Sequence, residues 1–171
     1  PLPTASTTAA LAMGDALAVA LIERKGFRQD DFTILHPAAG LGRRLMTVGE
    51  LMQTGEAIPR VLESTPFKDL IYEISSKKLG MTTVVAPEGE LRGIITDGDL
   101  RRLMERREDL HLVVASDFMT PHPKVIDREA LATRALKVME DHAITSLLIV
   151  DEARRVTGVI HLHDILRAGI V

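Results

Sequence analysis

The sequence predicts a mixed α/β (α+β) fold in which one β-α-β-β-α unit occurs twice. The stretch GIITDGDLRR at 93–102 returns in altered form as GVIHLHDILR at 158–167, with Asp at the seventh place and Arg at the tenth. Upstream of each stretch, an amphipathic helical pattern precedes a short apolar strand. Two halves of roughly 60 residues bury too little surface to be stable alone, so we expect them to pack together with pseudo-twofold symmetry.

Local signals place the elements of the first repeat. Thr47 precedes Glu50 by three residues, which is the spacing of a capping box at the start of a short helix. An amphipathic helix follows, with Thr65 as its cap, Pro66 in its first position and Gly80 at its end. The other expected elements are an extended piece at 57–61, strands at 82–86 and 91–96, a turn at 87–90 and a closing helix from Asp97.

The second repeat shows the same order of signals. Its apolar helical stripe consists of Leu131, Ala135, Val138 and Met139. The other expected elements are an extended piece at 123–126, strands at 145–150 and 155–160, and a closing helix near His163.

The first 45 residues belong to neither repeat. They predict a helix that begins near Thr4 and stops at Gly26, and between Ala9 and Ile22 its only polar side chain is Asp15. A helix that is apolar on nearly all sides is normally buried, and two small repeats offer no obvious room for it. We therefore expect this helix to come from another domain and the chain to be a fragment, in agreement with its start at PLP.

Composition narrows the class of protein. The 171 residues are 46% hydrophobic and 3% aromatic, so the core must be largely aliphatic. The net charge of −3 is atypical of nucleic-acid-binding proteins, which usually carry a basic surface. Cysteine is absent, which excludes disulfides and thiolate metal sites and fits a reducing cytoplasm. The longest apolar run, at 7–22, is interrupted by Asp15, and we expect it to be too short to span a membrane.

The repeat resembles the cystathionine-β-synthase (CBS) domain, which usually occurs as a tandem pair. The family's pattern G-x-I-T-x-x-D before the last helix is carried by Gly93, Ile95, Thr96 and Asp99, and in the second copy by Gly158, Ile160 and Asp164, with His161 in place of Thr. The resemblance implies CBS repeats at 47–110 and 111–171, preceded by a helix and linker at 1–46.

In this family the Asp accepts hydrogen bonds from ribose hydroxyls, and the residue before the helix lies beside ribose and phosphate. The resemblance therefore implies nucleotide sites, in which the base lies between the extended piece and the first long strand of the same repeat. The helix N-terminus and nearby arginines can hold a phosphate. The expected site residues are Ala57, Ile58, Pro59, Thr83, Val84, Thr96, Asp99, Arg101 and Arg102 in the first copy, and Lys124, Ile126, Thr145, Ser146, His161, Asp164 and Arg167 in the second.

The same residues have a purely structural interpretation. Thr96 and Asp99 have the spacing of a capping box, which needs no ligand, and the arginines can be solvated side chains. Because the second copy lacks the hydroxyl, we expect the first site to be the better one. His161, His163 and Asp164 form too thin a ligand set, so we expect no metal.

A second resemblance concerns the N-terminal part. The segments TASTTAALAMGDALAVAL and HPAAGLGRRL are similar to the end of the sugar isomerase domain of arabinose-5-phosphate isomerases, in which a CBS pair follows that domain. The family form is closer to HPGGxLGRKL, so Ala38, Ala39 and Arg44 depart from it. The family's active-site His maps onto His36, where it implies proton transfer between ketose and aldose phosphates. The remaining active-site groups are missing from this sequence.

The two resemblances together imply a regulatory fragment of a D-arabinose-5-phosphate isomerase, which converts ribulose 5-phosphate to arabinose 5-phosphate for Kdo and lipopolysaccharide synthesis. The implied ligand is an anionic nucleotide, either the end product CMP-Kdo or an adenosine nucleotide, and no cofactor is required. The expected partners are the isomerase domain and further copies of the chain, as a dimer of CBS pairs or a tetramer of the full protein, in the cytoplasm without nucleic acid or membrane. The fragment alone should be inactive. A ligand-free structural module and a CBS pair from another parent, such as a transporter or nucleotide dehydrogenase, stay open, although HPAAGLGRRL argues against the latter.

Overall fold

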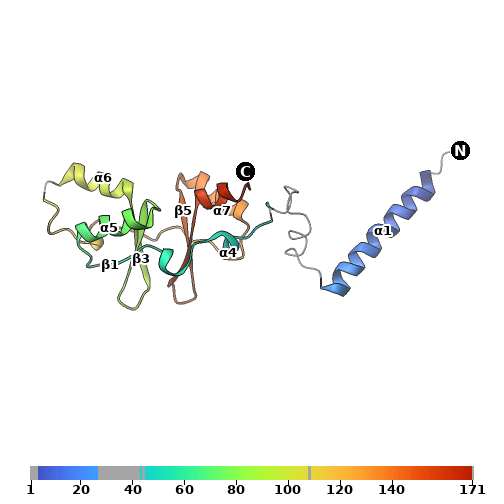
Figure 1. Ribbon diagram of the computed structural model, residues 1–171, viewed down its shortest axis with the longest axis horizontal. Coiled ribbons are helices and arrows are strands. Elements are labelled where there is room, and N and C mark those ends of the chain that lie inside the picture. Colours follow the sequence, from blue (N-terminus) through green and yellow to red (C-terminus); the bar gives the residue numbers. More distant parts are fainter. Residues whose placement is uncertain (1–3, 27–42, 44, 108, 171) are drawn as a thin grey trace. The chain divides into compact units, whose positions relative to one another are not determined.

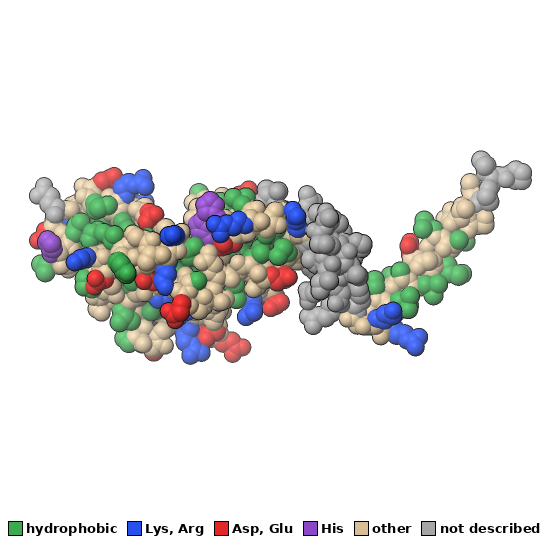
Figure 2. All heavy atoms as spheres, in the orientation of Figure 1, with side chains coloured by type: hydrophobic (Ala, Val, Ile, Leu, Met, Phe, Trp, Pro, Cys, Tyr) green, Lys and Arg blue, Asp and Glu red, His purple; other side chains and the backbone are tan. Residues whose placement is uncertain are grey.

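The computed structural model describes residues 4–26, 43, 45–107 and 109–170, which divide into two compact units, Pro1–Leu45 and Met46–Val171. The first unit contains helix α1 (Thr4–Lys25), which stops at Gly26 with a positive φ of 60°, as predicted. No residue of α1 is buried, and Figure 2 shows hydrophobic side chains along it. At 22 residues α1 is long and apolar enough to cross a membrane, so the expectation that it is too short is wrong. Core helices of other proteins and signal sequences can be equally long and apolar, so this property alone is weak evidence of a membrane span.

The second unit contains both repeats (Figure 1). The first repeat consists of α4 (Val48–Leu51), η1 (Gly55–Ala57), β1 (Arg60–Leu62), α5 (Phe67–Lys77), β2 (Met81–Val85), β3 (Leu91–Thr96) and α6 (Asp97–Arg106). The second consists of η2 (Ala115–Asp117), β4 (Thr120–Pro121), α7 (Ala132–His142), β5 (Ser146–Val150), β6 (Val156–His161) and α8 (Leu162–Arg167). The predicted β-α-β-β-α order is confirmed, except that the first strand of the second repeat is a single parallel bridge between Val125 and Leu148.

The boundaries of α5 differ from those predicted. Pro66 is the N-cap of the helix and not its first residue. Thr65 does not cap the helix, because its hydroxyl oxygen accepts the Leu62 N–H at 2.9 Å and closes the turn before it. At the other end Lys78 adopts the left-handed conformation with φ 59°, so the helix stops two residues before the expected Gly80.

The segment with which each repeat begins pairs with the sheet of the other repeat. We call residues 46–53 the first leading segment and residues 114–121 the second leading segment. β4, in the second leading segment, adds to the sheet β1-β2-β3 of the first repeat. Gln53, in the first leading segment, pairs with Val159 of β6 through two N–H···O bonds of 2.8 and 3.0 Å. Each sheet is therefore completed by a strand or bridge from the other half of the sequence.

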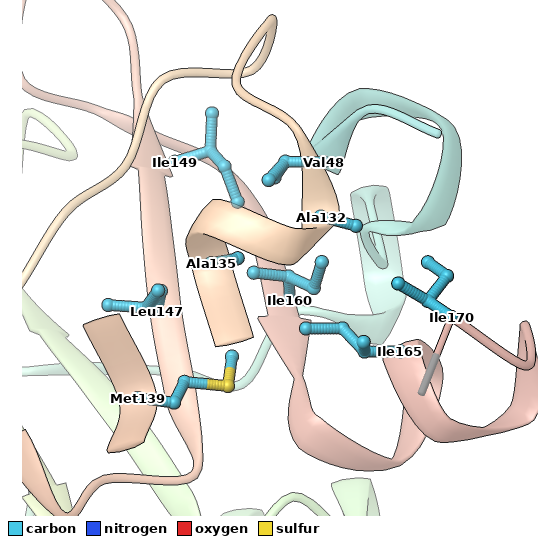
Figure 3. Packing of buried hydrophobic residues seen from close by; sticks show 9 residues of the cluster. All are labelled: Val48, Ala132, Ala135, Met139, Leu147, Ile149, Ile160, Ile165 and Ile170. Carbon is cyan, nitrogen blue, oxygen red and sulfur yellow. The ribbon is translucent and has the colours of Figure 1, made fainter. Parts of the chain in front are cut away.

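The hydrophobic cores are exchanged in the same way. Val48 of α4 packs into the core of the second repeat, as Figure 3 shows; that cluster consists of Val48, Ala132, Ala135, Met139, Leu147, Ile149, Ile160, Ile165 and Ile170. Ala115 packs reciprocally into the core of the first repeat, beside Leu70 and Ile95. A third cluster joins the repeats directly, with Ile58 and Met81 on one side and Leu148 and Val159 on the other. Because neither core is complete alone, we expect the two repeats to unfold together.

The glycine that opens the repeated pattern has a packing role. A Cβ on Gly93 would lie 2.8 Å from Met119 Sδ and 2.9 Å from the Thr120 carbonyl oxygen. A Cβ on Gly158 would overlap the side chain of Met52. Met52 and Met119 lie at equivalent places in the two leading segments, so each glycine is needed where a leading segment crosses the opposite sheet.

Candidate functional site

The first candidate cleft is centred on Asp99, in the first turn of α6. Asp99 Oδ2 accepts the Thr96 N–H at 2.9 Å and the Thr96 hydroxyl at 2.7 Å, so the two residues form the capping box that their spacing predicts. Asp99 Oδ1 accepts Nη2 of Arg102 at 2.6 Å. The Asp99 side chain is 10% exposed and that of Arg102 is 59% exposed. A ligand hydroxyl can therefore reach Asp99 by displacing the exposed arginine, whereas the cap itself stays in place.

A cavity of about 430 Å³ extends from Asp99 along α6 towards the second leading segment. Its lining residues are Asp99, Arg102, Leu103, Arg106, Arg107, Asp117 and Phe118. Five of these are absent from the site predicted from the sequence, namely Leu103, Arg106, Arg107, Asp117 and Phe118. Helical spacing from Asp99 could have indicated Arg106, but the approach of Asp117 and Phe118 follows only from the exchange of the leading segments.

The second candidate cleft is centred on Asp164, the equivalent of Asp99. Its Oδ2 accepts the His161 N–H at 3.1 Å and the side-chain amide of Gln53 at 3.1 Å. Gln53 belongs to the first repeat and lies 111 residues away in sequence. We call both places composite clefts, because in each the Asp of one repeat meets the leading segment of the other; the cavity described above lies at Asp99. Sequence reasoning missed Gln53 because it expected each site to be built within one repeat.

His161 takes the capping place that Thr96 has in the first repeat. Its Nδ1 accepts the N–H of His163 at 3.1 Å, so the neutral ring carries its proton on Nε2. Burial is the main cause that lowers the pKa of His161, the charge of His163 adds to it, and the charge of Asp164 opposes it. The neutral form is therefore favoured near pH 7, with Nε2–H as a hydrogen-bond donor.

Ser146 lies directly across from His161 in the β5–β6 pairing. Its hydroxyl oxygen is buried and has no hydrogen-bond partner among the described residues. The equivalent pair in the first repeat is Met81 and Thr96, and Met81, the counterpart of Ser146, has no hydroxyl group. Because a buried hydroxyl without a partner is unfavourable, Ser146 is a polar difference between the two repeats beside His161.

The extended pieces beside which the base is expected pair directly with the neighbouring strands. The Thr83 hydroxyl and N–H both donate to the Pro59 carbonyl oxygen, at 2.7 and 3.1 Å, and the side chains of Thr83 and Val84 are fully buried. In the second repeat Leu148 bonds in the same way to both Lys124 and Ile126. The extended pieces are therefore hydrogen-bonded directly to the strands, and the position of a base beside them stays a prediction.

The CBS domain profile matches residues 48–106 and 114–170 of this sequence. The chain belongs to the CBS domain family. The arabinose 5-phosphate isomerase KdsD of Pseudomonas aeruginosa is 46% identical over 170 residues, which cover 99% of this chain and 52% of that protein. The chain therefore spans about half the length of the curated relatives that it matches.

Two solved CBS structures have the same fold as this CBS pair. The protein CBSX2, solved in complex with AMP, is 24% identical with a TM-score of 0.61, and the match covers 72% of this chain and 96% of that chain. A CBS domain pair solved with methylthioadenosine and S-adenosyl-L-methionine is 18% identical with a TM-score of 0.63, over 72% of this chain and 94% of that chain.

The remaining predicted residues of the CBS pair lie outside these contacts. Ala57 is exposed in η1, whereas Ile58 is buried between the repeats. Arg101, Lys124, Thr145 and Arg167 are exposed, and within the described ranges none of their side chains makes a hydrogen bond or ion pair. His36 lies outside the described residues. The described part of the chain contains no group of three side chains that could hold a metal ion.

Proposed function

We propose that this chain is the regulatory CBS pair of a D-arabinose-5-phosphate isomerase, together with the last helix and linker of its sugar isomerase domain at 1–46. The main support is the match to KdsD, which extends over 99% of the chain and so includes these residues. The exposed apolar surface of α1 also fits a helix that packs inside a further domain. In the whole cytoplasmic protein, His36 would transfer a proton between ribulose 5-phosphate and arabinose 5-phosphate, on the way to Kdo and lipopolysaccharide.

The chain alone should not catalyse this reaction, because His36 lacks the other groups of the active site. The test measures isomerisation of arabinose 5-phosphate by the purified chain, with the isomerase domain joined to this region as the positive control. Turnover above the buffer rate that disappears in His36→Ala would contradict the proposal.

We further propose that the pair senses an anionic nucleotide at the composite clefts. Support comes from Asp99 and Asp164, which lie part-buried in the two clefts and can accept hydrogen bonds from ribose hydroxyls. The solved CBS structures with AMP and with methylthioadenosine and S-adenosyl-L-methionine have the same fold. CMP-Kdo is the candidate that the proposed pathway favours, because control of a first step by an end product is economical. Adenosine nucleotides are the alternative.

The test is thermal melting of the chain with CMP-Kdo, CMP, AMP, ADP, ATP and S-adenosyl-L-methionine in turn. At about 100 times Kd, a ligand stabilises the folded state by roughly 2.7 kcal/mol, which raises Tm by about 5–10 °C for a chain of this size. Asp99→Asn or Asp164→Asn should remove the shift, depending on the cleft that is occupied. Asp141→Asn, on the exposed face of α7, is the matched control.

A second candidate function is a structural module that binds no ligand and holds subunits together. It is favoured by the capping boxes, which are complete without a ligand, and by exposed apolar side chains on the repeat unit such as Tyr72 and Leu112. If no compound shifts Tm at millimolar concentration while sedimentation shows a dimer of CBS pairs, this function replaces nucleotide sensing.

A further inference from the structure

Three arginines line the cavity beside Asp99. Arg102 and Arg106 are four residues apart and so share one face of α6, and Arg107 follows directly. The side chain of Arg102 is held by Asp99, but the guanidinium groups of Arg106 and Arg107 make no hydrogen bond or ion pair with any residue in the described part of the chain. Like charges at this spacing repel one another, and an anion between them would remove that repulsion.

The carboxylates of the cavity do not neutralise these two arginines. Asp99 is occupied by Thr96 and Arg102. Asp117 Oδ2 accepts the Val114 N–H at 3.1 Å, so it caps the short helix η2. The cavity lining therefore carries three cations and two anions, and its hydrogen-bond donors without partners are guanidinium groups.

The position of the arginines in the helix offers a structural explanation for part of this cluster. Cations near the C-terminus of a helix interact favourably with its macrodipole, and Arg106 and Arg107 lie at that end of α6. This accounts for a basic residue there without any ligand. It does not account for an open cavity against Phe118 that two unpaired guanidinium groups line.

We propose that this cavity binds the phosphate group of a small phosphate monoester. Arg106 and Arg107 contact the phosphate oxygens, for which the planar guanidinium group is well matched, and Leu103 and Phe118 contact the body of the ligand. The inference rests on the ligand-sensing role proposed above and assigns the place of the anionic group. The phosphate can come from a nucleotide seated on Asp99 or from a free pentose phosphate.

The experiment compares phosphorylated and unphosphorylated probes by isothermal titration calorimetry. The probes are AMP, CMP and arabinose 5-phosphate, each paired with adenosine, cytidine or arabinose. We expect at least one phosphate to raise affinity by about tenfold or more over its partner, and Arg106→Ala/Arg107→Ala to remove that gain. Arg101→Ala is the control, because it removes one charge from α6 at an exposed position that does not line the cavity.

The outcomes separate this inference from the nucleotide-sensing role. The inference is overturned if the affinity gained from the phosphate group survives in Arg106→Ala/Arg107→Ala, or if that gain is lost equally in Arg101→Ala. Nucleosides that bind as well as nucleotides leave sensing in place and also overturn it. If arabinose 5-phosphate binds through Arg106 and Arg107 while no nucleotide binds, the phosphate site is supported and the nucleotide-sensing role is contradicted. If no probe binds, this inference fails, whereas nucleotide sensing is decided by the melting test with CMP-Kdo, ADP, ATP and S-adenosyl-L-methionine.

Discussion

The side-chain amide of Gln53 donates a hydrogen bond to the carboxylate of Asp164 at 3.1 Å, across 111 residues of sequence. The main chain of Gln53 is also bonded twice to Val159, so this residue fixes the end of the first leading segment on the second repeat. The equivalent residue of the second leading segment is Thr120, and its side chain makes no such bond to Asp99. The two clefts therefore have different resident partners, an amide at Asp164 and an arginine at Asp99.

The first prediction concerns this contact. Gln53→Ala should lower the free energy of unfolding by about 1 kcal/mol, because a part-buried hydrogen bond to a charged group is lost. Thr120→Ala is the matched control and should cost less than about 0.5 kcal/mol, since Thr120 is exposed. Urea unfolding followed by circular dichroism measures both. Equal losses in the two variants would show that the Gln53 side chain contributes nothing specific.

The second prediction concerns the glycines beneath the leading segments. Gly158→Ala and Gly93→Ala should each cost about 1–3 kcal/mol, because a methyl group meets atoms that already fill the space. Met52→Ala should recover much of the loss in Gly158→Ala, since all three nearest atoms belong to the flexible Met52 side chain. Met119→Ala should recover little in Gly93→Ala, because the Thr120 carbonyl oxygen remains 2.9 Å away.

Double-mutant cycles measure the two coupling energies in urea. We expect a clear favourable coupling at Gly158 and a small one at Gly93. Equal coupling at both sites would mean that the backbone of the second leading segment yields as easily as a methionine side chain does.

The exchange of the leading segments marks the limit of what the sequence predicts. Internal repetition and local signals were sufficient for the helices and strands: β2, β3 and the start of α6 at Asp97 lie where the apolar runs and the capping spacing put them. Local pattern does not say which copy of a core an apolar residue completes. Val48 and Ala115 are hydrophobic enough to pack into the core of either repeat, and only the three-dimensional packing places each in the core of the opposite repeat.

The same limit applies to the candidate site. The carboxylates Asp99 and Asp164 could be predicted because they recur in register in both repeats. Gln53 and Phe118 could not, because their approach to the clefts depends on long-range pairing with β6 and β3. The lack of a hydrogen-bond partner for the Ser146 hydroxyl likewise could not be predicted, since a serine at the start of a strand is ordinarily hydrogen-bonded or solvated.

The third prediction follows from the lowered pKa of His161, whose charged and polar neighbours are His163, Asp164 and, on the paired strand, Ser146. Below its ordinary pKa of 6.5 the unfolded chain binds a proton that the folded chain resists. The contribution of His161 to stability is therefore complete above pH 6.5 and is lost as the pH falls through the interval between 6.5 and the lowered pKa. Replacing His161 with Thr, the residue of the first repeat, should flatten stability in that interval.

Two measurements check this prediction. A nuclear magnetic resonance titration should give His161 a pKa below that of a histidine in a model peptide. Urea unfolding over about pH 5–7.5 should show a steeper decline for the natural chain than for His161→Thr. A ring that titrates at or above the ordinary value would contradict the burial argument.

The last prediction concerns the hydroxyl oxygen of Ser146, whose removal should affect stability and ligand binding in opposite ways. Ser146→Ala should leave the ligand-free chain as stable or raise its free energy of unfolding by about 1 kcal/mol, because the hydroxyl oxygen is buried without a partner and its removal relieves that cost. If a ligand in the second cleft satisfies this hydroxyl, the same substitution should reduce the rise in Tm produced by the nucleotide that binds there.

Ser116→Ala, at an exposed position of η2, is the control for loss of a serine hydroxyl. Melting curves with and without ligand give both quantities from one preparation. A lower Tm of Ser146→Ala without ligand would mean that the hydroxyl has a stabilising role in the fold, and an undiminished ligand shift would place the nucleotide away from Ser146.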